Sequence, residues 1–186
     1  DTRSAEYGSI ASGMLLYGIS LIYGLTGSLA LDAIAQNIGA EPGLGLIVGV
    51  VFVVAAIAFK FGAVPFHMWV PDVYHGAPTA VTLFVSTAPK FAYFALFYRL
   101  LAQGLEGLSP TWTQIIAVIA VLSLFVGNVY AIAQTNLKRM LAYSSIAHAG
   151  YILLAVAAAQ TPAVAPSAVA AALFYLLTYT FTNLGA

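Results

Sequence analysis

The chain has 186 residues, of which 62% are hydrophobic and 6% are charged, and its formal net charge is zero. Soluble domains carry roughly 25% charged residues, so this composition excludes an ordinary soluble domain and predicts an integral membrane protein. The neutral charge offers no electrostatic basis for binding nucleic acid. The absence of cysteine excludes disulfides, thiolate-bound iron–sulfur clusters and cysteine-bound zinc in this chain.

Six stretches are apolar and, at 1.5 Å per residue, long enough to cross a hydrocarbon core about 30 Å thick. They cover residues 8–31, 44–64, 79–101, 112–134, 143–159 and 167–186. The runs lack the alternation of strands, and their short links favour antiparallel neighbours. We therefore expect one all-α, polytopic transmembrane domain over residues 1–186. Because the chain starts without Met and stops inside an apolar run, we expect it to be an internal fragment of a longer protein.

The positive charges predict the orientation of the spans. Six spans place Arg3, Lys138 and Arg139 on the same side as the N-terminus, whereas the opposite side has only Arg99. Cytoplasmic loops carry the excess of Lys and Arg, so the N-terminal side is expected to face the cytoplasm.

Lys60 lies near the end of the second span. A charge at hydrocarbon depth costs about 2.5–3.5 kcal/mol on insertion scales, so it usually faces protein or a water-filled path. Pro65 leaves the carbonyl of Phe61 without a helical partner and Gly62 loosens the same turn, which predicts a break in the helix. Transporters use such broken helices to line cavities. The alternative for Lys60 is that it snorkels to the cytoplasmic interface.

The loop at residues 65–78 contains two histidines. His67 follows Lys60 by seven positions, about two turns if the helix resumes in register. An imidazole titrates in the range that a proton relay needs, although either His67 or His75 could be a solvated loop residue. We expect Asp72 to cap the next helical turn rather than to bind a metal.

Lys90 lies in the middle of the third span, where snorkelling is difficult. Pro89 frees the carbonyl of Val85, which predicts a distorted helix beside the charge. Burial disfavours the ammonium form, so such a lysine can exchange a proton near neutral pH. The alternative is a structural ion pair with a carboxylate elsewhere in the full protein.

Polar stripes mark the last two spans. Ser144, His148 and Tyr151 occupy positions i, i+4 and i+7, so one helix face carries three hydrogen-bonding groups that could pass protons or join helices. A weaker stripe in the last span consists of Tyr175, Tyr179 and Thr182. Lys138 and Arg139 are expected to be topology anchors at the membrane edge.

Three segments carry a family resemblance. Residues 59–79 contain a Phe-His-x-Trp-x-Pro-Asp core, residues 86–92 contain Pro89-Lys90, and residues 136–151 run from Asn136 to Tyr151. Together they resemble the antiporter-like subunits of respiratory complex I, the proton-translocating NADH:quinone oxidoreductase. Val73-Tyr74 stand where sister subunits usually have Ala-His, which narrows the resemblance to one of the paralogous subunits.

The resemblance implies that the six spans match the sixth to eleventh helices of a fourteen-helix subunit. Lys60 would be the lysine of the broken seventh helix, Lys90 the central relay lysine of the eighth, and His148 the histidine of the tenth. The family's key glutamate and its distal lysine fall outside residues 1–186. Glu6 belongs to Arg3-Ser4-Ala5-Glu6, which resembles the family's Arg-Ser-x-Glu run, but the spacing to Leu15-Leu16-Tyr17-Gly18 is several residues short.

The implied function is proton transport along Lys60, His67, Lys90 and His148, with Ser144, Tyr151 and Glu6 as weaker candidates. Other subunits of the hetero-oligomer would bind NADH, FMN, iron–sulfur clusters and quinone, and this chain would bind no cofactor or metal. The implied location is the bacterial inner membrane or its mitochondrial equivalent. The alternatives are an Mrp-type cation/proton antiporter subunit, a membrane subunit of a hydrogenase or ferredoxin:plastoquinone complex, and a non-catalytic scaffold.

Overall fold

The computed structural model describes residues 2–39, 41–161 and 163–186, and the side chains of residues 2–5 and 7, including that of Arg3, lie outside this description. The described ranges are helical and contain no strand. The elements are α1 (Thr2–Thr26), α2 (Leu31–Asn37), α3 (Leu44–Phe61), α4 (Trp69–Gly76), α5 (Thr79–Phe97), a π-helix η1 (Tyr98–Gly104), a 3₁₀ turn η2 (Glu106–Leu108), α6 (Ser109–Ile132), α7 (Leu137–Ala158) and α8 (Ala165–Gly185).

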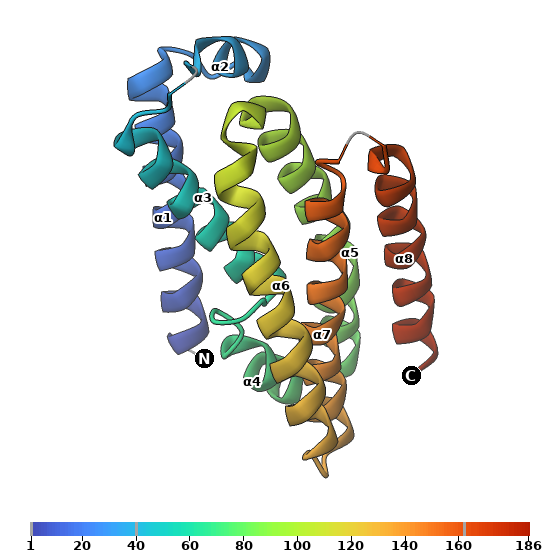
Figure 1. Cartoon of the computed structure of the whole chain (residues 1–186). Coiled ribbons are helices and arrows are strands. Elements are labelled where there is room, and N and C mark those ends of the chain that lie inside the picture. Colours follow the sequence, from blue (N-terminus) through green and yellow to red (C-terminus); the bar gives the residue numbers. More distant parts are fainter. Residues whose placement is uncertain (1, 40, 162) are drawn as a thin grey trace.

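Six of these helical segments are long and apolar enough to cross a membrane: Gly8–Thr26, Leu44–Phe61, Thr79–Gly104, Glu106–Ile132, Leu137–Ala158 and Ala165–Gly185. They run side by side as a bundle (Figure 1). The N-terminus, α4 and the turn between α6 and α7 lie at one end, and α2 lies at the other (Figure 1). The predicted polytopic α-helical membrane fold is therefore confirmed.

Small residues bring pairs of helices into close contact. A Cβ atom added to Gly127 of α6 would lie 2.5 Å from the backbone nitrogen of Ala147 in α7, and one added to Gly150 of α7 would lie 2.9 Å from the carbonyl oxygen of Ala120. A Cβ atom added to Gly18 of α1 would lie 2.8 Å from the carbonyl oxygen of Gly49 in α3. Glycine at these positions lets the backbones approach, as is common between membrane helices.

Large apolar side chains also cover the outside of the bundle. Phe84, Phe125, Phe174 and Leu16 are about two-thirds exposed, whereas Trp112, Phe97 and Ile57 are fully buried in the core. An apolar exterior around an apolar core fits a bundle that is solvated by lipid and by neighbouring membrane helices rather than by water.

Several of the predicted span boundaries differ from the structure, and for two of them the local backbone gives the reason. The first span ends at Thr26 rather than at residue 31, because Gly27 has φ +72° and turns the chain toward the separate helix α2. The fifth span begins at Leu137 rather than at residue 143, because the Asn136 side chain accepts a hydrogen bond from the backbone N–H of Arg139 and caps α7. Lys138 and Arg139 therefore lie in the first turn of α7 and not in a loop.

The predicted break beside Lys60 is present. Helix α3 ends at Phe61, Gly62 adopts a left-handed conformation with φ +70°, and the N–H of Ala63 bonds the carbonyl of Ala58. This pattern is a common helix C-cap. The helix does not resume in register, however, because α4 is a separate short helix that packs against α7.

Helix α5 differs from the prediction at Pro89. The α-helical segment Thr79–Phe97 continues through Pro89, and regular α geometry gives way to a π-helix only at Tyr98–Gly104. The distortion expected beside Lys90 thus lies about two turns further along the span.

Candidate functional site

Lys90 is the most deeply buried charged residue among those described, with 3% of its surface exposed. Its Nζ atom lies 2.7 Å from the hydroxyl and 3.1 Å from the carbonyl oxygen of Ser145 in α7. It also lies 3.2 Å from the hydroxyl of Tyr179 in α8. The third, fifth and sixth spans therefore meet at this one side chain.

Ser145 is a site residue that the sequence reasoning missed. The predicted stripe contained its neighbour Ser144, which is only partly buried. The buried positions of α7 include Ala142, Ser145, Ala149 and Ile152, which follow a helical spacing of three and four residues. Ser145 thus lies on the buried face of α7, which contacts Lys90. Because α7 is apolar on most sides, the sequence alone does not show which face is buried.

His148 lies one turn beyond Ser144 and contacts the last span. Its Nδ1 atom forms a short hydrogen bond with the hydroxyl of Tyr175 in α8. Its ring centroid lies 4.9 Å from that of Tyr179 and 6.4 Å from that of Tyr151. His148, Tyr175 and Tyr179 thus form a continuous aromatic group that begins at Lys90. Thr182, the third member of the weaker stripe, is exposed and donates a hydrogen bond to the carbonyl of Thr178.

Lys60 is partly buried at the break after α3. Its Nζ atom lies 5.8 Å from the ring centroid of Tyr93 in α5, which places a cation near an aromatic face. It lines a cavity of about 270 Å³ together with Gly8, Phe59, Trp69, Val73 and Tyr93. Glu6 is exposed and lies two residues before Gly8 in α1. Among the described residues, no carboxylate lies within ion-pair distance of Lys60.

The Trp69 indole holds the broken segment in place. Its N–H donates a hydrogen bond to the carbonyl oxygen of Phe59 at 3.0 Å, and its ring stacks on the ring of Phe59. The carbonyl of Phe59 belongs to the last turn of α3 and also accepts a hydrogen bond from the backbone N–H of Gly62 at 2.9 Å. The indole therefore adds a second hydrogen bond to a backbone group next to the lysine.

His67 lies between α3 and α4. Its Nδ1 atom is buried and has no hydrogen-bond partner in the described structure. Burial lowers the pKa of this imidazole below its ordinary value, and the nearby backbone of Pro65 opposes that effect only in part. Helix α3 ends between Lys60 and His67, so the two residues do not share one continuous helix face as a helix resuming in register would require.

The lowered pKa of His67 predicts a pH-dependent opening of this segment. When the segment opens, the imidazole regains its ordinary pKa of about 6.5, so below that pH the open state binds more protons than the folded state. The fold around residues 62–70 should therefore lose stability as the pH falls through about 6.5 toward the lower folded-state pKa. Hydrogen–deuterium exchange of the intact complex at pH 7.5 and 5.5, corrected for intrinsic rates, should show more opening at pH 5.5.

A His67→Gln variant provides the control for this effect. Glutamine does not titrate, so the exchange of residues 62–70 should become equal at the two pH values. An equal response of wild type and variant to pH would contradict the assignment to His67.

Helix α4 is attached to the beginning of α7 by polar contacts. Asp72 forms an ion pair with Arg139 at 3.1 Å, and the ammonium group of Lys138 donates to the carbonyl of Ala77 at 3.2 Å. The Nδ1 atom of His75 lies 3.3 Å from the side-chain oxygen of Asn136. Asp72 thus pairs with a cation of another helix and makes no capping contact at Met68, the N-cap of α4.

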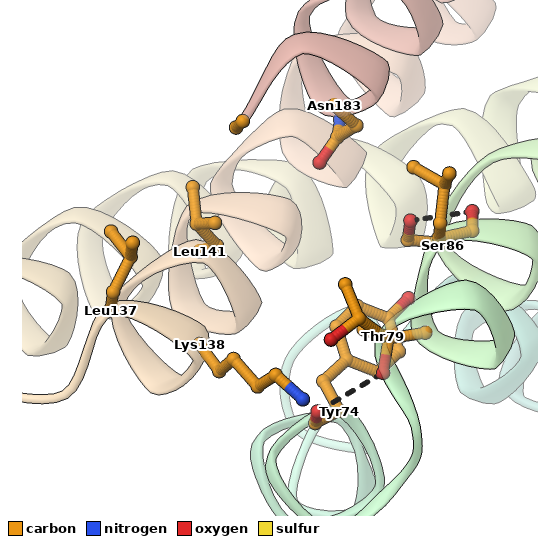
Figure 2. A pocket seen from close by; sticks show the side chains of 10 residues that line it. Tyr74, Thr79, Ser86, Leu137, Lys138, Leu141 and Asn183 are labelled. Carbon is orange, nitrogen blue, oxygen red and sulfur yellow. Dashed lines mark hydrogen bonds between the residues drawn. The ribbon is translucent and has the colours of Figure 1, made fainter.

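A cavity of about 190 Å³ lies between α4, α5, α7 and α8. Figure 2 shows Lys138 extending from α7 toward α4, with Ser86 of α5 and Asn183 of α8 on the other side. Tyr74 lines the same cavity and its side chain interacts with Ser145, so the wall of the cavity touches the contacts of Lys90. Burial, more than the nearby Tyr179 and Tyr93, raises the pKa of Tyr74, which keeps its phenol neutral and able to donate a hydrogen bond.

The side chains gathered around Lys90 are donors and acceptors of protons: a lysine, a histidine and the hydroxyl groups of Ser145, Tyr175 and Tyr179. Among the described residues, no group of three or more His, Asp or Glu side chains is arranged to hold a metal ion.

Comparisons with known proteins agree on one family. The sequence profile of the family described as "NADH:quinone oxidoreductase/Mrp antiporter, TM" matches residues 3–186. NADH-quinone oxidoreductase subunit N of Thiobacillus denitrificans is 56% identical over 180 residues, which cover 96% of this chain and 36% of that protein. The chain thus spans about a third of the length of the curated relatives that it matches.

Solved structures show the same likeness. A chain of respiratory complex I from Thermus thermophilus superposes with a TM-score of 0.75 at 38% identity, over 98% of this chain and 37% of that one. A chain of the Mrp complex from Dietzia sp. superposes with a TM-score of 0.82 at 28% identity, over 96% of this chain and 32% of that one. The resemblance found in the sequence motifs, including its narrowing to one paralogous subunit, is therefore confirmed.

Proposed function

The chain belongs to the NADH:quinone oxidoreductase/Mrp antiporter family of transmembrane proteins, and from this premise we propose that it is the central part of a proton-translocating subunit of an NADH:quinone oxidoreductase. It is a multi-pass protein of the bacterial inner membrane, as its six apolar helices and its bacterial relatives indicate. Electron transfer from NADH to quinone takes place in other subunits, which carry the redox cofactors. This chain moves protons.

The observation that carries the proposal is the burial of Lys90 in the middle of the bundle among neutral partners. An ammonium group at this depth is costly, and the charged residues found inside membrane spans usually mark an ion or proton pathway. It lies next to Ser145, Tyr179 and, through Tyr179, His148, all of which carry exchangeable protons or accept them. When a proton moves from Lys90 to His148, only these two side chains therefore change their charge.

Lys60 is the second cation of the proposed path, and His67 lies between it and α4. A glutamate outside this fragment would pair with Lys60 and stabilise its ammonium form, because an opposite charge within about 4–6 Å favours the charged state. Breaking that pair would release the Lys60 proton and push the next proton out of Lys90. The broken helix supports this proposal, since irregular backbone at membrane depth is tolerated where it lines a cavity or is buried in protein.

The competing function is cation/proton antiport without a redox partner. The structural likeness to a chain of the Mrp complex is the observation that favours it. The two are separated by measuring proton uptake into inverted membrane vesicles that carry the full-length subunit. The proposal predicts uptake that starts with NADH, stops when the NADH-oxidising subunits are removed, and is the same in sodium and in potassium buffer. Uptake that persists without those subunits and requires Na⁺ would favour the antiporter.

A further inference from the structure

The contacts of Lys90 match the hydrogen-bonding capacity of an ammonium group. An ammonium has three N–H donors and no acceptor. The Nζ atom lies within hydrogen-bond distance of three oxygens: the carbonyl and the hydroxyl of Ser145 and the hydroxyl of Tyr179. The one ion pair among the described residues joins Arg139 to Asp72, so neutral oxygens alone compensate the charge of Lys90 here.

Two of these three acceptors can also donate. A neutral amine has two N–H donors and one lone pair, so loss of a proton requires one neighbour to turn a hydrogen toward Nζ. The carbonyl of Ser145 cannot do so, but the hydroxyls of Ser145 and Tyr179 can. The Tyr179 hydroxyl already donates to the Ser145 hydroxyl oxygen at 3.0 Å, and it needs only to rotate its hydrogen to reach Nζ.

Tyr179 also connects Lys90 with the next base. Its ring is buried, and its centroid lies 4.9 Å from that of His148, whose Nδ1 atom pairs with Tyr175. Other titratable groups near this cluster are Tyr74 of α4, which interacts with Ser145, Tyr93 of α5, which acts on Tyr74, and Tyr151 of α7, whose ring contacts those of His148 and Tyr175. None of these described neighbours is a carboxylate, so a hydroxyl group is the adjustable partner of Lys90 here.

We propose that Tyr179 is the positioning residue that lets Lys90 hold and release a proton, by accepting a hydrogen bond from the ammonium form and donating one to the amine form. In the release step one N–H bond of Lys90 breaks and its electron pair stays on Nζ. The proton passes to the imidazole of His148, and the Tyr179 hydroxyl then donates to the lone pair. This inference rests on the proposed function and assigns a role to a residue of the last span.

The test is the pH profile of NADH-driven proton uptake in membranes that carry the full-length subunit with Tyr179→Phe in the assembled complex. Phenylalanine keeps the ring and removes only the hydroxyl, so the ammonium form loses one of its three acceptors. We expect the alkaline limb of the profile to move to lower pH by about one unit, because a hydrogen bond to a charged group is roughly twice as strong as one to a neutral group. Removal of the hydroxyl therefore costs the ammonium form more than it costs the amine form. A purely structural role would lower uptake equally at every pH.

Two further variants make the test decisive. Ser145→Ala removes the other hydroxyl that can both accept and donate a hydrogen bond, and it should shift the alkaline limb of the pH profile in the same direction. It replaces the first variant if Tyr179→Phe does not assemble. Tyr23→Phe removes a phenol hydroxyl from a half-exposed residue of α1 and should leave the profile unchanged. Unchanged profiles in assembled Tyr179→Phe and Ser145→Ala complexes would overturn the inference.

The outcome is separable from that of the proposed function. If Lys90→Ala stops proton uptake while the profiles of the two hydroxyl variants stay unchanged, Lys90 is on the path and only the role of Tyr179 falls. If Lys90→Ala leaves uptake intact, the proposed path itself falls.

Discussion

Replacing Lys90 by alanine should reduce NADH-driven proton uptake by at least about tenfold, because proton transfer by a positioned side chain contributes factors of that size or more. The variant removes the charged group that α7 and α8 hold in the middle of the bundle. Uptake is measured as fluorescence quenching of a pH-sensitive dye in inverted vesicles, at equal amounts of assembled complex.

Two control variants distinguish the loss of the charge of Lys90 from the loss of its side-chain volume and from the loss of any cation in the same span. Lys90→Met keeps most of the side-chain volume and should lose uptake to the same extent, which excludes a cavity as the cause. Arg99→Ala removes an exposed cation from the end of the same span and should leave uptake near the wild-type level. Uptake retained by Lys90→Met and lost by Lys90→Ala would show that packing, and not the ammonium group, is what Lys90 provides.

Replacing Gly127 by valine should have the second large effect, on assembly. The new Cβ would lie 2.5 Å from the backbone nitrogen and 2.9 Å from the Cα of Ala147. Backbone atoms cannot rotate away, so α6 and α7 have to separate, and overpacking of this kind costs about 1–3 kcal/mol. A loss of that size changes the abundance of a protein several-fold, so the amount of assembled complex on a native gel should fall by that factor.

The matched control for Gly127→Val is Gly24→Val. Gly24 also lies inside a membrane helix, but a Cβ atom there meets nothing within 4 Å in the described structure. Both variants introduce the same β-branched residue, so helix propensity is held constant. Equal loss of complex in the two variants would mean that the close contact of α6 with α7 is not what stabilises the bundle.

The spans could be predicted because lipid imposes a length and a composition on them. A run of about 20 apolar residues is visible without knowing what surrounds it. The boundaries were less certain where a single contact decides them. Asn136 caps α7, so Lys138 and Arg139 belong to the helix. Hydropathy alone predicted a loop there, because both residues are charged.

The break after Lys60 could also be predicted, since Pro65 and Gly62 act through the local backbone. The direction of the chain after the break could not. Helix α4 is placed by its packing on α7 and by the ion pair of Asp72 with Arg139, which are 67 positions apart in the sequence. Local reasoning therefore located His67 at the break but not its distance from Lys60.

The partners of Lys90 show the limit of sequence reasoning most clearly. Lys90, Ser145 and Tyr179 come from three helices, and which side chains meet depends on how each helix is rotated about its axis. In a soluble helix the polar face reveals that rotation, but these spans are apolar on nearly every side. The two predicted stripes in the last spans included Tyr179, which contacts Lys90, but they contained Ser144 and not its neighbour Ser145.

The most direct test of the central claim is the number of protons taken up per electron transferred from NADH to quinone, measured in native membranes with an intact complex that carries Lys90→Ala. A ratio separates a lost proton path from slower turnover, which lowers the rate of pumping but not its stoichiometry. The account predicts a lower ratio than in wild type at the same electron flux, because the proton path through Lys90 is blocked. An unchanged ratio would contradict it and would make Lys90 a structural charge.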